Sequence, residues 1–190
     1  MTWLALFSQS GSEICNLSEA IGRYPDLVIS DNVKVDNKVD ERIEQNCKKV
    51  LWRAYRKLTP AAKLEYFRNF LGDYDIITLH GWLNIIPPEI CDEFTIYNGH
   101  PGLINYYPQL KGKDPVDKVW ANISDFMYVG SVIHKVTAEV DCGDIICASQ
   151  LSYVNCTSLE ETYKVARRTS LTSWIDFFTK EYYNKMASAI

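Results

Sequence analysis

The chain lacks the features that mark membrane, secreted and zinc-binding proteins. Its apolar runs all fall short of the ~20 residues that span a bilayer, and its first residues carry no positive charge of the kind that opens a signal peptide. The six cysteines include no C-x-x-C pair and mostly lie within apolar runs, which predicts reduced thiols with neither a zinc site nor a disulfide framework. We therefore expect a cytoplasmic protein with no bound metal.

Positive charge is also scarce. The chain has 20 Lys and Arg against 24 Asp and Glu, a net charge of −4, so no overall basic field would attract nucleic acid or an anionic membrane. An anionic substrate would need a local basic pocket. The sequence shows no repeats, low-complexity runs or linkers, and 190 residues with 47% hydrophobic content suffice for one core. We expect a single catalytic domain over residues 1–190, as a monomer or a homodimer.

Short apolar runs alternate with helical patterns through the first two thirds of the chain. Such alternation predicts an α/β fold, a doubly wound and mostly parallel sheet with helices on both faces. A capping box from Ser158 to Glu161 opens a long amphipathic helix near the end of the chain. The strands are expected at 3–7, 27–30, 75–79, 94–97, 129–136 and 145–148, and the other helices at about 14–21, 36–57, 60–71, 88–92 and 115–122.

Polar groups follow several of the expected strands, which is where ligands bind in parallel α/β proteins. The first group is Ser10-Gly11-Ser12-Glu13, between a strand and a helix. Its backbone N–H groups could hold a phosphate at the helix N-terminus. Two Ser and a Gly are also common in a turn whose side chains simply cap the following helix, and Glu13 adds a negative charge that would repel a phosphate. The sequence leaves both interpretations open, phosphate binding and helix capping.

Asn98 and His100 follow the strand expected at 94–97, and Asp141 lies in a later turn. A lone histidine after a strand is more often packed or capping than catalytic, which is the interpretation we give His80 and His134. Asn98 and His100 are two residues apart and so point to the same side of an extended backbone. An amide, an imidazole and a carboxylate together can move an acyl group between amines.

Three segments carry a specific resemblance. They are DIITLHGWLNIIP at 75–87, YNGHPG at 97–102 and GSVIHKVTAEVDCGDII at 130–146. In this combination they resemble the 10-formyltetrahydrofolate-dependent formyltransferases, over about residues 1–180. In size the chain is most similar to the purine-biosynthesis member of that family, glycinamide ribonucleotide formyltransferase. The resemblance implies the formyltransferase fold, with an antiparallel portion from the later strands, and 10-formyltetrahydrofolate as co-substrate.

The resemblance also implies which residues do the chemistry. Asn98, His100 and Asp141 match the catalytic trio of the family. An unprotonated amine attacks the formyl carbon, Asn98 and a protonated His100 stabilise the oxyanion, and Asp141 keeps His100 protonated and helps to pass on the proton. The folate site of the family is formed by two loops, which here supply Trp82, Leu83, Ile85, Ile86, Val136, Thr137, Glu139, Val140 and Asp141.

Departures from the family pattern fall on the side of the amine substrate. Glu13 places an acid in the phosphate turn, a longer loop follows His100, and Arg167-Arg168-Thr169 stands where the purine enzyme has a Glu. We expect a small phosphorylated amine, either glycinamide ribonucleotide-like or an amino-sugar nucleotide. The residues expected to bind it are Ser10, Gly11, Ser12, Glu13, Lys111 and Arg168, with Lys113 and Arg167 as further anion contacts or plain surface charge.

Two other functions stay open. One is hydrolysis of 10-formyltetrahydrofolate, with water in place of the amine, and the other is folate binding without activity. A transfer-RNA substrate is not expected, because those relatives carry C-terminal additions and this chain is acidic. Release of tetrahydrofolate that depends on an amine would indicate a transferase.

Overall fold

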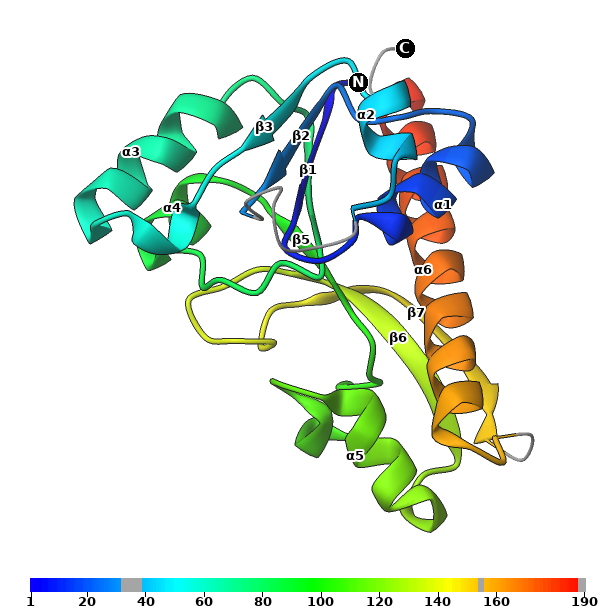
Figure 1. The fold of residues 1–190 in the computed structure, drawn as a ribbon. Helices are drawn as coiled ribbons and strands as arrows, with labels where there is room; N and C mark the ends of the chain where they lie inside the picture. The colour runs from blue at the N-terminus through cyan, green and yellow to red at the C-terminus, as the bar shows by residue number, and fades with distance from the viewer. Residues whose placement is uncertain (32–38, 154–155, 188–190) are drawn as a thin grey trace. The chain divides into compact units, whose positions relative to one another are not determined.

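The computed structural model describes residues 1–31, 39–153 and 156–187. In these residues the strands form one sheet in the order β3-β2-β1-β4-β5-β6-β7 (Figure 1). The pairs β1–β2, β1–β4, β2–β3 and β4–β5 are parallel, whereas β6–β7 is antiparallel. The predicted mostly parallel sheet with an antiparallel portion is thus confirmed. The strands are β1 (Trp3–Phe7), β2 (Leu27–Ser30), β3 (Val50–Trp52), β4 (Ile76–His80), β5 (Tyr97–His100), β6 (Tyr128–Lys135) and β7 (Ile145–Ser152).

The chain divides into two compact units. The first unit comprises Met1–Asn98 and Lys135–Cys142, and the second comprises Gly99–His134 and Gly143–Ile190. The strand β5 contributes residues to both units. The expectation of a single catalytic domain over residues 1–190 stays a prediction.

The first unit is built on buried parallel strands. All residues of β1 are buried, and β2 and β4 flank it, with Leu4 opposite both Leu27 and Ile77. Strands covered on both faces need continuous apolar runs, which is why the sequence reveals them. Helices α1 (Ser12–Ile21) and α3 (Pro60–Leu71) lie on opposite sides of these strands (Figure 1).

The helix predicted over residues 36–57 is wrong for most of its length. Residues 36–38 lie outside the described residues, α2 covers only Arg42–Asn46, and β3 pairs with β2. Val50 and Leu51 fit a helical stripe and a short strand equally well. Hydrogen bonding to β2 makes this segment a strand, and the 3₁₀ helix η1 (Tyr55–Lys57) follows it.

The strand predicted at 94–97 is displaced towards the carboxyl end. Helix α4 (Pro88–Glu93) ends at Phe94, whose backbone N–H still donates to Ile90 O (2.9 Å), and β5 begins only at Tyr97. Asn98 and His100 therefore lie within the strand and not in the loop after it.

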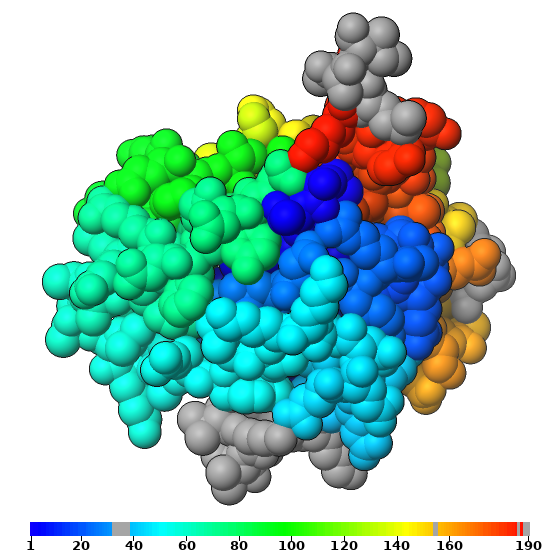
Figure 2. Space-filling model, turned by 90° about the horizontal axis from the view of Figure 1, so that it is seen from above, coloured from blue at the N-terminus to red at the C-terminus, as the bar shows by residue number. Residues whose placement is uncertain are grey.

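The first residues of the chain are tied to the start of β4. Thr2 Oγ1 donates to Asp73 O (3.2 Å), and Asp75 N donates to Thr2 Oγ1 (3.0 Å). Figure 2 shows the amino-terminal residues, in dark blue, at the surface among the blue and teal segments of the first unit. These bonds hold β1 beside β4 at its amino end.

An ion pair fixes the connection that follows β1. Asp40 N donates to Ser10 O (2.9 Å), and the Asp40 carboxylate accepts two hydrogen bonds from the Arg42 guanidinium, at 3.0 and 2.7 Å. Arg42 also forms an ion pair with Glu19 on α1 (2.8 Å). The hydrogen bonds from Arg42 hold the pKa of Asp40 below its usual value.

In the second unit, helices pack on the ribbon of β6 and β7. Helix α6 (Leu159–Ala187) lies along β7, and α5 (Pro115–Ala121) packs against α6. Tyr163 Oη on α6 donates to Asp117 Oδ2 on α5 (2.5 Å). The 3₁₀ helices η2 (Pro108–Leu110) and η3 (Ile123–Asp125) flank α5. The apolar cluster of this unit comprises Leu103, Ile104, Leu110, Val116, Val119, Phe126, Val129, Val132, Cys156 and Ala166.

All six cysteines lie within the described residues and are free thiols, as the sequence predicts. None of the helices in the described part of the chain combines the length and the apolar character needed to cross a membrane.

The strand β5 makes a close approach to α6 at Gly99. Trp174 is fully buried, and a Cβ atom built on Gly99 would lie 2.7 Å from its Nε1 atom. A side chain at this position would have to displace the indole ring. Since Gly99 stands between Asn98 and His100, the approach fixes the part of the strand that carries His100.

Gly99→Ala is expected to lower the free energy of unfolding by about 1–3 kcal/mol, since the added methyl group overpacks a fully buried site. Gly72→Ala is the matched control, because a Cβ atom there meets nothing within 4 Å. Urea unfolding followed by circular dichroism measures both variants. Wild-type stability in Gly99→Ala would contradict the close approach.

Asp40 is expected to add stability that is present above about pH 4 and lost on acidification, because a carboxyl with a lowered folded-state pKa favours folding only while ionised. The difference in unfolding free energy between wild type and Asp40→Asn should be largest at neutral pH and vanish below the folded-state pKa. Urea unfolding across the acidic range measures it. Asp92→Asn, which removes an exposed carboxyl group, controls for the change in net charge. A difference independent of pH would show that the charge is not its source.

Candidate active site

The predicted site residues fall in both units. The first unit contains Asn98, Asp141, both predicted folate loops and the turn of residues 10–13. The second unit contains His100, Lys111 and Arg168.

The turn at residues 10–13 is tight and leads directly into α1. Gly11 adopts a left-handed conformation (φ 73°), and a Cβ atom there would lie 3.2 Å from side-chain atoms of both Phe7 and Ile43. Ser12 N donates to Ser10 Oγ (3.3 Å), so a side chain satisfies one of the N–H groups that a helix start leaves open.

Glu13 is held by a histidine that is itself part of a buried network. His80 Nδ1 lies 2.8 Å from Glu13 Oε2, and His80 Nε2 lies 2.9 Å from Thr78 Oγ1. Trp3 Nε1 donates to the same Thr78 oxygen (2.8 Å). His80 is buried, as the sequence suggests, but its pairing with Glu13 joins residues 67 positions apart and is not visible in the sequence.

The pairing of Glu13 with His80 holds a carboxylate at the N-terminus of α1. The Glu13 side chain is 33% exposed and lies in the first turn of the helix, the place where the helix dipole favours an anion. The protein therefore supplies its own carboxylate at a position where a phosphate would otherwise bind.

The loop after β4 separates buried from exposed apolar side chains. Trp82 and Ile86 belong to the core of the first unit, whereas Leu83 and Ile85 are 60% and 65% exposed. Leu83 N donates to Ser8 Oγ (2.9 Å), which holds the loop against the end of β1. Trp82 and Ile86 thus anchor the loop, and the side chains of Leu83 and Ile85 are the ones that can contact a ligand.

A carboxylate that the sequence reasoning missed fixes the same loop. Asp31 follows β2 with its side chain fully buried, and its Oδ2 atom accepts from Asn84 Nδ2 (2.5 Å) and Arg56 Nε (3.2 Å). Asn84 stands between Leu83 and Ile85, so its hydrogen bond to Asp31 fixes the exposed part of the loop. An Asp directly after a buried strand is the signal that could have drawn attention to it.

The second predicted folate loop lies in the first unit as well. Val136 N donates to Ile96 O (2.8 Å), and Thr137 Oγ1 donates to Glu139 O (2.8 Å). Val140 is 49% exposed, and Asp141 adopts a left-handed backbone conformation (φ 54°) that aspartate tolerates better than most residues. The first unit thus presents exposed apolar side chains on both loops, which fits a flat, largely aromatic ligand such as a folate.

His100 is buried in the second unit and has a defined proton position. Its Nε2 atom lies 2.9 Å from the backbone carbonyl oxygen of Leu110. A carbonyl oxygen can only accept, so Nε2 carries a proton, and Nδ1 is the acceptor atom of the neutral ring. Asn98 precedes His100 by two residues in the same strand, β5, and residues at that spacing lie on the same side of an extended backbone.

The predicted cationic contacts of the second unit differ in their surroundings. The Lys111 residue is partly buried, and its backbone carbonyl accepts from Lys118 Nζ (2.9 Å). Arg168 is exposed and lines a pocket of about 340 Å³ together with Thr169, Thr172 and residues of β7. Arg168 therefore has room for a ligand beside it.

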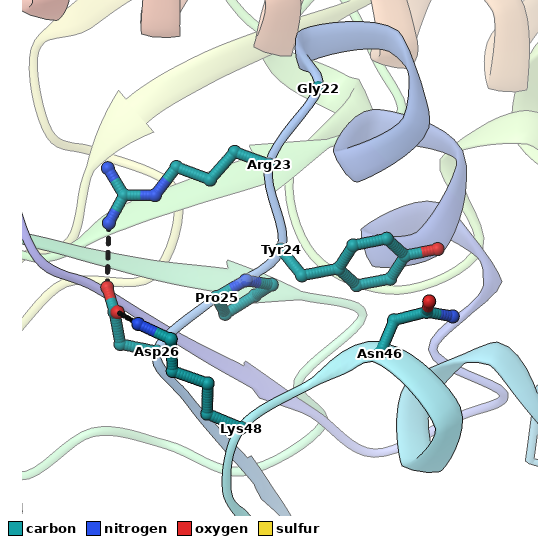
Figure 3. A pocket seen from close by; sticks show the side chains of 7 residues that line it. All are labelled: Gly22, Arg23, Tyr24, Pro25, Asp26, Asn46 and Lys48. Atoms are coloured by element: carbon teal, nitrogen blue, oxygen red, sulfur yellow. Dashed lines mark hydrogen bonds and ion pairs between the residues drawn. The ribbon is translucent and has the colours of Figure 1, made fainter.

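A larger pocket of about 460 Å³ lies away from every predicted site residue (Figure 3). Asp26, directly before β2, accepts there from Arg23 (2.7 Å) and Lys48 (3.0 Å). The pocket is thus at the amino end of β2, whereas ligands of parallel α/β proteins bind at the carboxyl ends. The size of a pocket does not identify the site in this protein.

Among the described residues, no group of three or more His, Cys, Asp or Glu side chains could hold a metal ion.

The chain is similar to known proteins in sequence. A model of the formyl transferase family matches residues 27–172. A phosphoribosylglycinamide formyltransferase of Dictyostelium discoideum is 30% identical over 110 residues, which are 53% of this chain and 53% of that protein. The match spans about half the length of this curated relative.

The fold is similar to solved structures at low sequence identity. A phosphoribosylglycinamide formyltransferase from Coxiella burnetii has a TM-score of 0.78 at 18% identity, with 93% of this chain and 84% of that chain covered. A formyltetrahydrofolate deformylase from Pseudomonas syringae has a TM-score of 0.71 at 20% identity, with 91% and 58% covered. These likenesses show the fold, and the family match covers well over half of the chain, which therefore belongs to the formyl transferase family.

Proposed function

We propose that the protein transfers the formyl group of 10-formyltetrahydrofolate to the primary amine of a small phosphorylated substrate. Besides family membership, one observation carries the proposal. His100 is buried in β5, two residues from Asn98, with Nε2 fixed as a hydrogen-bond donor. A buried imidazole of defined tautomer near a side-chain amide is suited to proton transfer and to stabilising an oxyanion.

Each side chain of the proposed trio has its own task. The amide N–H of Asn98 donates to the formyl oxygen as negative charge develops there. Because Leu110 engages Nε2 of His100, the imidazole acts through Nδ1. Asp141 favours the protonated form of the imidazole and relays the proton that the amine loses. The folate, when bound, supplies the activated formyl group on its N10 atom.

The folate half of the proposal is supported by exposed apolar side chains. Leu83, Ile85 and Val140 are each about half exposed or more, in two loops of the same unit. Apolar side chains that gather on the surface mark binding sites more often than apolar side chains exposed singly. We propose that they cover the rings of the folate, while Trp82 and Ile86 support the first loop from below.

The identity of the amine is suggested by the relatives and restricted by Glu13. Proteins similar to this chain are named for glycinamide ribonucleotide, a phosphorylated primary amine. A carboxylate at the α1 N-terminus would repel a phosphate there. We propose that Lys111 and Arg168 contact the phosphate instead, and that Glu13 accepts hydrogen bonds from hydroxyl or amine groups.

Hydrolysis of the folate is the second candidate function. The observation in its favour is the likeness in fold to a formyltetrahydrofolate deformylase, of which this chain covers 58%. Water would then take the place of the amine between the same side chains. Incubation with 10-formyltetrahydrofolate alone and with a panel of amines separates the two functions, because a transferase releases tetrahydrofolate only with its amine.

Asn98→Ala, His100→Ala and Asp141→Ala are each expected to lower kcat by about 10²–10³, the usual effect of removing an oxyanion donor or its support. Absorbance detection of tetrahydrofolate formation measures the rates. Asp144→Ala is the matched control, since Asp144 is an exposed carboxylate three residues from Asp141. Wild-type turnover in Asp141→Ala would sink the assignment of the trio.

Glu13→Gln should leave the preference for glycinamide ribonucleotide over its unphosphorylated ribonucleoside within about twofold of wild type, because the proposed phosphate contacts are Lys111 and Arg168. A like charge beside the phosphate would cost on the order of 1 kcal/mol, and its removal would raise that preference about fivefold. Glutamine keeps an oxygen that can accept from His80. The ratio of kcat/KM for the ribonucleotide and its unphosphorylated ribonucleoside is the readout. Glu65→Gln, an exposed carboxylate on α3, is the control. A ratio about fivefold higher in Glu13→Gln would mean that the phosphate lies beside Glu13, against the proposal.

A further inference from the structure

We propose that Lys118 is a positioning residue for His100, because it clamps the two backbone carbonyls that flank Leu110 and so holds the Leu110 oxygen against the imidazole. The inference rests on the role of His100 in the proposed function. Its geometry lies entirely within the second unit.

The clamp is formed by one ammonium group and two carbonyls. Lys118 Nζ donates to Lys111 O at 2.9 Å and to Gln109 O at 3.4 Å. These residues stand immediately before and after Leu110, whose carbonyl accepts from His100 Nε2 at 2.9 Å. The ammonium group therefore restrains the chain on both sides of the atom that orients the imidazole.

The segment that carries this carbonyl also has backbone hydrogen bonds of its own. Residues 101–114 contain only one short 3₁₀ helix, η2 (Pro108–Leu110). Within it, Leu110 N donates to Tyr107 O (2.9 Å), and the Leu110 side chain is buried in the apolar cluster of the second unit. Lys111 N, which belongs to the same peptide unit as the Leu110 carbonyl, donates to Pro108 O (3.2 Å), and the bonds from Lys118 restrain the carbonyls of the two neighbouring peptide units.

Lys118 is itself held in place by its helix. The neighbouring Asp117 accepts from Tyr163 Oη at 2.5 Å, which ties α5 to the long helix α6. Lys118 N also donates to Asp114 O at 3.1 Å at the start of α5. The position of the clamp is therefore set by packed helices and not by the loop that it restrains.

Glycine at position 102 completes the arrangement. A Cβ atom there would lie 3.2 Å from His100 Nε2, 3.2 Å from Leu110 Cβ and 3.1 Å from Pro115 Cβ. The imidazole, the Leu110 segment and the start of α5 thus meet around a residue without a side chain. The three parts can approach closely only while this space stays empty.

The chemical consequence concerns the tautomer of His100. A carbonyl acceptor at Nε2 stabilises the form with the proton on Nε2 and leaves Nδ1 as the atom that exchanges a proton during the reaction. If the Leu110 carbonyl turned away, the neutral ring would populate both tautomers, and only a part of the molecules would present Nδ1 in the acceptor form.

Lys118→Met tests the inference. It keeps the length of the side chain but removes its donors, whereas Lys118→Arg retains them. Lys164→Met is the matched control, since Lys164 is an exposed lysine of the same unit, on α6. Two-bond ¹H–¹⁵N correlation spectra of the imidazole rings show which nitrogen carries the proton, and the His100 signals are those missing from His100→Gln. The chain has only 3 histidines, so the spectra are simple.

In wild type, in Lys118→Arg and in Lys164→Met, we expect neutral His100 to be the Nε2–H tautomer. In Lys118→Met we expect averaged signals of both tautomers, and kcat lowered about tenfold with KM for the folate unchanged, a fraction of the 10²–10⁴ that acid–base catalysis contributes. Wild-type ring spectra in Lys118→Met would overturn the inference. If the wild-type protein transfers no formyl group, the proposed function fails, while the ring spectra still decide the role of Lys118.

Discussion

The contact between the backbone at Gly99 and the buried indole of Trp174 is the constraint on which the candidate site depends. β5 can lie against α6 only because residue 99 has no side chain, and this strand carries Asn98 and His100 on either side of that residue. A long helix with a buried aromatic ring thereby sets the position of a four-residue strand. The rigidity of the second unit is passed to the imidazole through this packing as well as through the hydrogen bond from His100 Nε2 to Leu110 O.

The fold could be predicted where burial dictates the residue types. The strands β1 and β2 are continuous apolar runs because parallel strands are covered on both faces, and the sequence reveals them with their observed bounds. β3 was missed because it has three residues, all only partly buried, and its apolar pair also fits a helix. Pairing with β2 decides its structure, and such pairing leaves no local pattern in the sequence.

The side chains of the candidate site could be proposed from the sequence, but the hydrogen bonds that connect them could not. The alternation of Asn98 and His100 follows from their spacing, and the exposed Leu83 and Ile85 fall in a loop that the resemblance singled out. The carbonyl of Leu110 and the clamp from Lys118 could not be foreseen. The backbone of every residue offers the same carbonyl acceptor, whatever the side chain. Which carbonyl meets an imidazole depends on how a loop folds, and composition does not encode that.

A hydrogen-bonded network runs from Glu13, in the first turn of α1, through His80 and Thr78 to Trp3. It joins the proposed substrate turn to the central strands β1 and β4. Glu13 is partly exposed, but its partner His80 is buried. A substitution at position 13 therefore requires a matching substitution at position 80. A basic residue at position 13 would place a hydrogen-bond donor against the imidazole where Glu13 now offers an acceptor, and an apolar residue would remove that acceptor. Directed evolution towards another amine should therefore randomise positions 13 and 80 together, since libraries that vary position 13 alone would lose many of their members to misfolding.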